Sequence, residues 1–294
     1  MTTAATSRPS PAAVTGSPSP VWEPAAGVAV RGTVLLLPGR GEHPGVYARF
    51  GRRLAFDGYR VVAQASPGSS ASPVPGSSAT QVLPAGGGGL PDLAGPVAEA
   101  RVAAPPGTPV VLAGSDTGAL LALAAARQAA PDGLLLVGLP TATRTRDADD
   151  AWTDELGART SCPAHRGLLA TDPDFRPGAL GEDVPAALAE AAEAAVPGVP
   201  ALVVHGAADP VSPPATARRF AGRLAAELVL VADGRHDALN DATHRSVAAA
   251  VVQWLERLRG GPHLPAQIVT DTTTASTDAD RLTPGPPAPE GDPA

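Results

Sequence analysis

The chain has 294 residues, a formal net charge of −7 and a single cysteine, Cys162. The negative charge argues against nucleic acid or an anionic membrane as a partner. One cysteine excludes an intrachain disulfide and a multi-cysteine zinc site. All 22 Lys or Arg positions hold Arg, which excludes chemistry that depends on a lysine amine, such as Schiff-base formation or phosphate binding by a P-loop.

The two ends of the chain have few bulky apolar residues. Residues 1–20 and 262–294 are rich in Ser, Thr, Pro and Ala, so we expect both to be disordered tails. Residues 21–261 are enough for one large core. The sequence has no basic patch followed by an apolar stretch and no apolar run of membrane-spanning length, so a cytoplasmic protein is expected.

Short apolar runs between Gly and Pro residues predict the strands. They lie at 33–37, 59–63, 109–113, 134–137, 201–205 and 228–231, and a short edge strand or hairpin is expected within 21–30. Apolar residues at helical spacing predict helices. They lie at 46–56, 96–103, from the turn at 114–118 to about 127, and at 184–195, 215–225 and 241–259.

Strands that alternate with helices, and that are apolar throughout, indicate a mostly parallel α/β sheet covered by helices on both faces. Two stretches interrupt the alternation. Residues 64–96 are rich in Ser, Pro and Gly and predict a long surface loop, whereas 140–199 contain no predicted strand. We expect 140–199 to form a small cap over the strand ends.

The turn Gly114-Ser115-Asp116-Thr117-Gly118 joins a predicted buried strand to an apolar helix. Its Gly-x-nucleophile-x-Gly spacing is typical of a sharp elbow that holds a nucleophile at the carboxyl edge of a parallel sheet. The central residue is usually Ser, but here it is Asp116.

Two further acid–base residues follow predicted strands. Asp209 comes four residues after the strand that ends at His205, and His236 comes after the last strand. Because parallel strands deliver their following loops to one edge, Asp116, Asp209 and His236 are expected to meet there. Asp209 would orient His236, and His236 would act as the base.

The order nucleophile, acid, histidine resembles that of the α/β-hydrolase superfamily, and the resemblance extends from Gly32 to Leu258. The segment Pro38-Gly39-Arg40-Gly41-Glu42-His43 is similar to the oxyanion loop of monoglyceride-lipase-like members. The resemblance implies an oxyanion hole made by the backbone N–H groups of Arg40 and Thr117. It also implies a small-molecule substrate, with no cofactor and no metal.

An Asp at the elbow resembles the haloalkane dehalogenase and epoxide hydrolase branches. The resemblance implies attack by Asp116 on carbon, followed by hydrolysis of the resulting ester by water that His236 activates. The chain departs from both branches. Its only tyrosines, Tyr47 and Tyr59, lie outside the predicted cap, and Thr117 follows the nucleophile where dehalogenases usually carry Trp. The bond cleaved therefore stays open among ester, lactone, epoxide and carbon–halogen bonds.

Two alternatives remain at this elbow. Ser115 is one residue out of register and is an alternative nucleophile for a serine-type esterase or lipase. The chain is alternatively a non-catalytic protein that binds a small molecule or a partner protein in the same pocket, with Asp116 as a remnant.

Several other residues can be interpreted either as functional or as simply structural. The predicted cap holds Trp152, which could substitute for a halide-binding Trp, and Cys162, which is either a small cap residue or a reactive thiol. Its Arg residues would bind an anionic substrate or form ordinary ion pairs: Arg159, Arg166 and Arg176. His43 and His205 are expected to make local hydrogen bonds, and the acidic run at 147–155 to begin a solvated helix rather than bind calcium.

Overall fold

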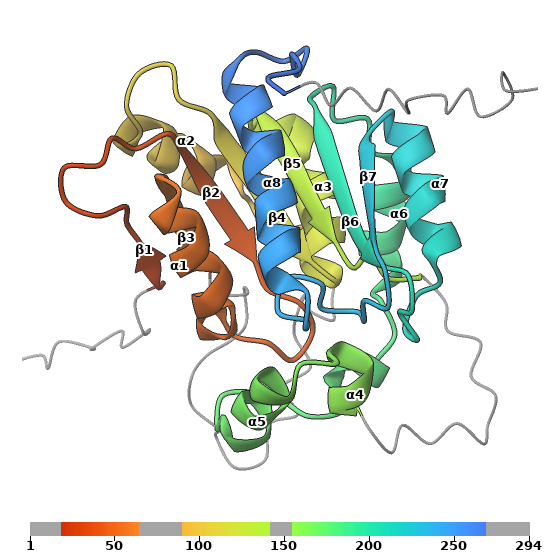
Figure 1. The fold of residues 1–294 in the computed structure, drawn as a ribbon. Helices are drawn as coiled ribbons and strands as arrows, with labels where there is room; N and C mark the ends of the chain where they lie inside the picture. Colours follow the sequence, from red (N-terminus) through yellow and green to blue (C-terminus); the bar gives the residue numbers. More distant parts are fainter. Residues whose placement is uncertain (1–18, 65–89, 142–154, 269–294) are drawn as a thin grey trace, which may run out of the picture.

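The computed structural model describes residues 19–64, 90–141 and 155–268. Within these residues seven strands form one sheet in the order β1-β3-β2-β4-β5-β6-β7, and β1 alone of them is antiparallel to its neighbour (Figure 1). The strands are β1 (Val21–Trp22), β2 (Gly32–Leu37), β3 (Tyr59–Ala63), β4 (Val110–Ser115), β5 (Gly133–Val137), β6 (Ala201–Gly206) and β7 (Glu227–Val231). The predicted α/β class with a mostly parallel sheet is confirmed.

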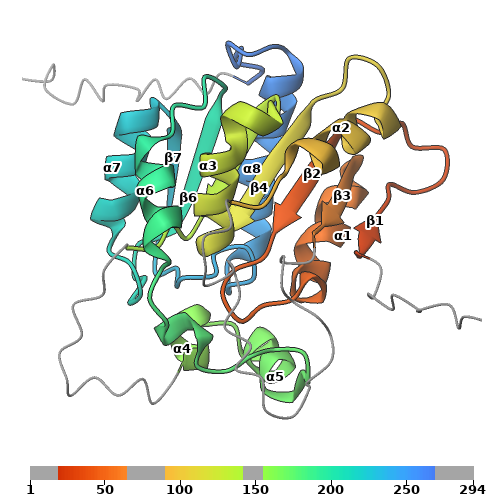
Figure 2. The same cartoon turned by 180° about the vertical axis from the view of Figure 1, so that it is seen from behind.

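Helices cover both faces of the sheet, which explains why every residue of β2, β4, β5 and β6 is buried. One face carries α1 (Ala48–Phe56) and α8 (His244–Arg259). Figure 2 shows the opposite face, which carries α2 (Ala94–Ala103), α3 (Thr117–Ala129), α6 (Ala186–Ala194) and α7 (Pro214–Leu224). Two apolar clusters therefore sandwich the sheet.

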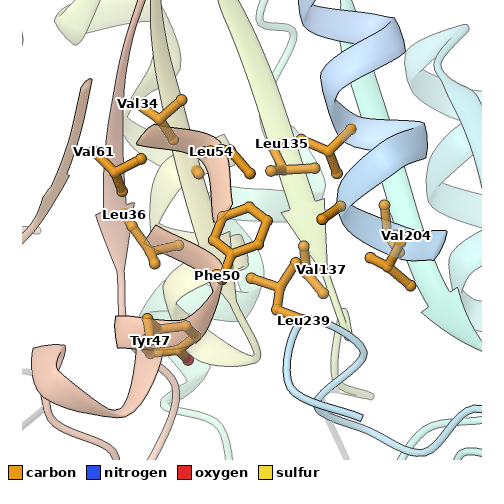
Figure 3. Packing of buried hydrophobic residues seen from close by; sticks show 14 of the residues in the cluster. Val34, Leu36, Tyr47, Phe50, Leu54, Val61, Leu135, Val137, Val204 and Leu239 are labelled. Carbon is orange, nitrogen blue, oxygen red and sulfur yellow. The ribbon is translucent and has the colours of Figure 1, made fainter. Parts of the chain in front are cut away.

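The cluster beneath α1 and α8 fixes the far end of the loop that leaves β2. Phe50 and Leu54 of α1 pack between sheet residues such as Leu36 and Leu135 (Figure 3). Tyr47 lies at the edge of this cluster and is fully buried. The short helix η1 (Pro44–Tyr47) carries it, so the loop after β2 is tied to the core at its far end.

The cap lies beyond the carboxyl ends of the strands, below the sheet in Figure 1. Its described part consists of α4 (Glu155–Arg159), α5 (Pro163–Thr171) and η2 (Ala179–Gly181). The helix α6 falls within the predicted cap stretch, but its Leu188 and Ala192 pack into the apolar cluster that contains α3. It covers the sheet and is not part of the cap.

Differences from the predicted elements are small. No strand forms at 28–30, and the last helix begins at His244 because residues 241–243 make turns. Trp152, most of the acidic run and the glycine-rich part of the 64–96 loop lie outside the described residues. In the part of the chain that is described, no helix has the length and apolar character needed to cross a membrane.

Candidate active site

The elbow between β4 and α3 has the sharp geometry that its sequence predicts. Asp116 has φ 51° and ψ −123°, a conformation that costs energy for a residue with a side chain. The glycines on either side are required by close backbone contacts. A Cβ on Gly118 would lie 2.4 Å from the carbonyl oxygen of Leu37, and one on Gly114 would lie 2.1 Å from that of Gly118. Small residues therefore allow Asp116 to stand at the sheet edge.

The structure brings Asp116, His236 and Asp209 together. His236 Nε2 lies 3.2 Å from Asp116 Oδ1, and His236 Nδ1 lies 2.8 Å from Asp209 Oδ2. The other oxygen of Asp209 accepts hydrogen bonds from the backbone N–H groups of Val211 and Ser212, at 2.8 and 3.2 Å. Asp209 is thereby fixed in the orientation that holds the imidazole toward Asp116.

The loop after β2 delivers a backbone donor to the same carboxylate. The N–H of Arg40 donates to Asp116 Oδ2 at 2.9 Å. Glu42 N–H donates to the carbonyl of Gly39 at 3.2 Å, and the N–H of Gly39 donates to Tyr47 Oη at 3.2 Å. These bonds set the plane of the peptide that carries the Arg40 N–H.

Thr117, the second predicted oxyanion-hole residue, lies at the first position of α3 beside Asp116. It is buried, and its hydroxyl lies 3.5 Å from Asp116 Oδ2. A helix N-terminus favours negative charge, so the elbow supplies a second stabilising element next to the carboxylate.

The Arg40 side chain is the feature that sequence reasoning missed. Its Nε lies 2.8 Å from Asp116 Oδ2 and its Nη2 lies 2.8 Å from Asp116 Oδ1, so the guanidinium donates a hydrogen bond to each oxygen. Arg40 and Asp116 are only 3% and 2% exposed, which makes this a closed ion pair. The motif had indicated only the backbone of Arg40, because the direction of a loop side chain is not encoded in the spacing of the motif.

The charges of the site follow from this arrangement. Burial opposes ionisation of Asp116, but the charge of Arg40 and the hydrogen bond from His236 hold the pKa of its carboxyl well below the usual value. Burial alone would lower the pKa of His236, but Asp209 and Asp116 raise it to about 9. At neutral pH the resting site therefore contains the ionised Asp116, an imidazolium and a guanidinium.

Ser115, the alternative nucleophile, lies beside Asp116 in the chain. It is the last residue of β4 and is 2% exposed. The histidine of the site is hydrogen-bonded to Asp116. The geometry thus assembles an Asp-His-Asp constellation.

The cap arginines form internal contacts. Arg159 is 1% exposed and pairs with Glu42 at 3.0 Å and Glu155 at 2.7 Å. Arg166 Nε donates to the carbonyl of Thr160 at 2.7 Å, and Arg176 pairs with the carboxylate of Glu182 at the cap surface. The guanidinium that binds Asp116 is instead that of Arg40.

Other singled-out residues have local partners. Cys162 is buried, with Arg49 Nη1 3.4 Å from its sulfur. Burial raises the pKa of the Cys162 thiol, but the hydrogen bond from Arg49 acts in the opposite direction, and the pKa is lowered overall. His205 Nε2 lies 2.9 Å from the carbonyl oxygen of Ser212, in agreement with the predicted local role.

His43, Asp172 and Asp174 place three ligand-type atoms within 4.8 Å of one another. However, His43 Nε2 lies 2.7 Å from Asp172 Oδ2, and His43 Nδ1 accepts the N–H of Gly45 at 3.2 Å. Both ring nitrogens are engaged, so this group is better explained as a link between the loop after β2 and the cap.

Comparisons with known proteins agree with the fold. A family described as serine aminopeptidase S33 matches residues 28–153, and a family described as TAP-like protein matches residues 182–267. No curated protein sequence matches the chain.

Solved structures of the same fold are distant in sequence. A soluble variant of monoglyceride lipase from Saccharomyces cerevisiae is 18% identical with a TM-score of 0.59, over 85% of this chain and 99% of the other. A thermostable carboxyl esterase from Bacillus coagulans is 16% identical with a TM-score of 0.60, over 81% and 93%. An enol-lactonase from Burkholderia xenovorans LB400 is 18% identical with a TM-score of 0.53, over 81% and 95%. The chain therefore has the fold of the α/β-hydrolases.

Proposed function

We propose that the protein hydrolyses a small organic molecule through Asp116 as nucleophile, His236 as base and Asp209 as the residue that orients His236. The observation that carries the proposal is the placement of the Asp116 carboxylate. Oδ1 lies 3.2 Å from His236 Nε2, and Oδ2 accepts the Arg40 backbone N–H at 2.9 Å. One oxygen thus lies where N–H donors stabilise developing negative charge, and the other faces the imidazole.

In the first step a carboxylate oxygen of Asp116 attacks the electrophilic carbon of the substrate. A carbon–oxygen bond forms, the bond to the leaving group breaks, and the leaving group keeps the electron pair. Because the pKa of Asp116 is held well below its usual value, the carboxylate is ionised without help from a base. At a saturated carbon the product of this step is an ester of Asp116, and at the acyl carbon of an ester or lactone it is a mixed anhydride.

In the second step His236 removes a proton from water, and the resulting hydroxide attacks Cγ of that ester. The backbone N–H groups of Arg40 and Thr117 stabilise the oxyanion. Collapse releases the alkoxide, which takes the proton from His236, and the new carboxyl group loses its proton to solvent. Esterification removes one of the two negative charges that raise the pKa of His236, so before this step the imidazolium gives its proton to the departing group or to solvent and becomes the neutral base.

The substrate class stays open among esters, lactones, epoxides and carbon–halogen compounds. The similar structures are named as lipase, esterase and lactonase, which supports esters and lactones. A carboxylate nucleophile supports attack on a saturated carbon, as in an epoxide or a halide. No cofactor takes part in either step.

A second function is supported by the Arg40–Asp116 ion pair. A guanidinium that grips both oxygens at 2.8 Å lowers the nucleophilicity of the carboxylate. In a protein that binds a small molecule without turnover, Asp116 could stay paired with Arg40, because no nucleophile is needed. Ser115 as the nucleophile of a serine-type reaction is the remaining alternative, in line with the name of the family that matches residues 28–153.

One experiment separates these functions. The His236→Ala variant is incubated with a panel of esters, lactones, epoxides and haloalkanes, and covalent adducts are located by peptide mass spectrometry. We expect an ester on Asp116, because the variant forms the intermediate but hydrolyses it slowly. Wild-type turnover in heavy-oxygen water should place the label in the Asp116 carboxylate.

Labelling of Ser115 by a serine-directed phosphonate, with loss of turnover, would contradict the carboxylate mechanism. Ligand binding without turnover of any substrate in the panel would favour the binding protein. Arg219→Gln is a suitable control, because Arg219 is an exposed residue of α7 that pairs with Glu193.

A further inference from the structure

The Arg40 side chain blocks the reaction in the structure as it stands. Both oxygens of Asp116 accept hydrogen bonds from the guanidinium, Oδ2 from Nε and Oδ1 from Nη2, each at 2.8 Å. The pair is almost fully buried, with side-chain exposures of 4% and 2%. If Asp116 is the nucleophile proposed above, the guanidinium must leave its carboxylate before an oxygen can attack carbon.

That displacement is unfavourable unless Arg40 finds a new anion. Separating a buried ion pair leaves uncompensated charge in a site that excludes water. A neutral substrate offers the guanidinium no replacement partner. A substrate that carries its own carboxylate offers the same two-oxygen pairing that Asp116 gives now, because guanidinium and carboxylate match edge to edge.

The position of Arg40 suits such an exchange of partners. Its remaining terminal nitrogen, Nη1, donates to the backbone carbonyl of Glu182 in the cap. The carboxylate of Glu182 itself is paired with Arg176, at 3.0 Å from Nη2. One edge of the guanidinium is therefore held over the site by the cap, while the edge that faces Asp116 is the one that would change partner.

We propose that Arg40 is the carboxylate-binding residue of the substrate site, and that the preferred substrate carries a carboxylate close to the reacting carbon. Binding of that carboxylate draws Arg40 from Asp116 and so frees the nucleophile. The residue thus determines specificity and gates the reaction. This inference rests on the proposed function only in taking Asp116 as the nucleophile.

The binding part is tested without any turnover. Propionate and its neutral analogue propionamide are titrated by calorimetry into the wild type, Asp116→Asn and Asp116→Asn/Arg40→Gln. Asp116→Asn removes the internal partner of Arg40, so we expect propionate to bind about tenfold or more tightly than to the wild type. Propionamide should gain nothing, and the double variant should lose the gain. Unchanged propionate affinity in a folded Asp116→Asn protein would overturn the proposal.

The gating part is tested by covalent trapping. The rates at which bromoacetate and bromoacetamide esterify Asp116 are measured by peptide mapping, and each is divided by the rate of the same probe with free acetate. Mapping separates this ester from a thioether on Cys162, because only the ester is cleaved by hydroxylamine. The measurement is made in the His236→Ala background, where the ester is hydrolysed slowly, and there we expect bromoacetate to be favoured by about 10- to 100-fold with or without Arg219→Gln. Adding Arg40→Gln should remove this preference and raise labelling by bromoacetamide.

The two arms distinguish the failure of each idea. Esterification by both probes at equal corrected rates would leave Asp116 as the nucleophile and overturn the role of Arg40. Gain of propionate binding in Asp116→Asn, without esterification by either probe, would support the carboxylate site and contradict the hydrolytic mechanism. Thermal unfolding of each variant verifies that it is folded.

Discussion

The guanidinium of Arg159, in the cap, lies 3.0 Å from the carboxylate of Glu42, in the loop after β2. Both side chains are almost fully buried, and Arg159 also donates to the carbonyl of Arg40 at 2.7 Å. Next to it, the N–H of Asp237 donates to the Arg159 carbonyl at 2.8 Å. One cap residue thus joins the loop of Arg40 to the loop of His236.

Arg159→Ala should destabilise the protein strongly. The change leaves Glu42 buried without its charged partner, and loss of one member of a buried pair costs about 3–5 kcal/mol. Urea unfolding measures the change in the free energy of unfolding. Arg176→Ala is the matched control, because the Arg176–Glu182 pair is partly exposed and should contribute about 1 kcal/mol or less. Equal losses in the two variants would contradict the anchoring role of Arg159.

The protein should lose stability between about pH 6.5 and pH 9. His236 has a folded pKa of about 9, above its ordinary value of 6.5. The contribution of His236 to the free energy of unfolding is fully present below its pKa in the unfolded chain. This contribution disappears as the pH rises through its pKa in the folded protein. The loss is limited to roughly 3 kcal/mol, since one pKa unit corresponds to about 1.4 kcal/mol. Urea unfolding of the wild type and of His236→Gln across this pH range tests the prediction. If the free energy of unfolding falls equally with pH in the variant, His236 is not the cause of the loss.

Asp209→Asn should slow the second chemical step more than the first. The amide would donate to His236 Nδ1, so the proton of the neutral ring would move to Nε2, where a lone pair is needed to accept a proton from water. We expect a loss of about 10²- to 10⁴-fold in turnover and accumulation of the ester on Asp116. Rapid-quench mass spectrometry measures that accumulation. A slower first step with no accumulated ester would contradict the assigned role of Asp209.

Gly118→Ala should destabilise the elbow. The added methyl group would lie 2.4 Å from the backbone carbonyl oxygen of Leu37, which cannot move without disturbing β2. We expect a loss of about 1–3 kcal/mol or more in the free energy of unfolding. In contrast, Gly222→Ala in α7 meets no atom within 4 Å and should stabilise the helix by about 0.5–1 kcal/mol. Thermal unfolding compares the two variants directly.

Much of the fold could be predicted because its signals are local in the sequence. The six main strands were predicted within a residue or two, since apolar runs between Gly and Pro mark buried parallel strands. Asp116, Asp209 and His236 were each expected at the end of a strand, and parallel strands bring such positions to one edge. The helix α6 was misplaced in the cap, because its Ala-rich sequence does not show that Leu188 packs into the cluster around α3.

The sequence by itself determined the class of the sheet, the elbow with Asp116 at its centre and the order of the three acid–base residues. Only the tertiary structure decided what surrounds that carboxylate. The Arg40 side chain binds Asp116, which is 76 positions away in the sequence, and Arg159 binds Glu42, which is 117 positions away. Such contacts depend on how loops and a cap fold back over the sheet edge, and loop side chains have no periodic pattern that encodes their direction. The strands therefore determine where the site lies. The packing of the loops and the cap over the sheet edge determines its charge state and places Arg40 on Asp116.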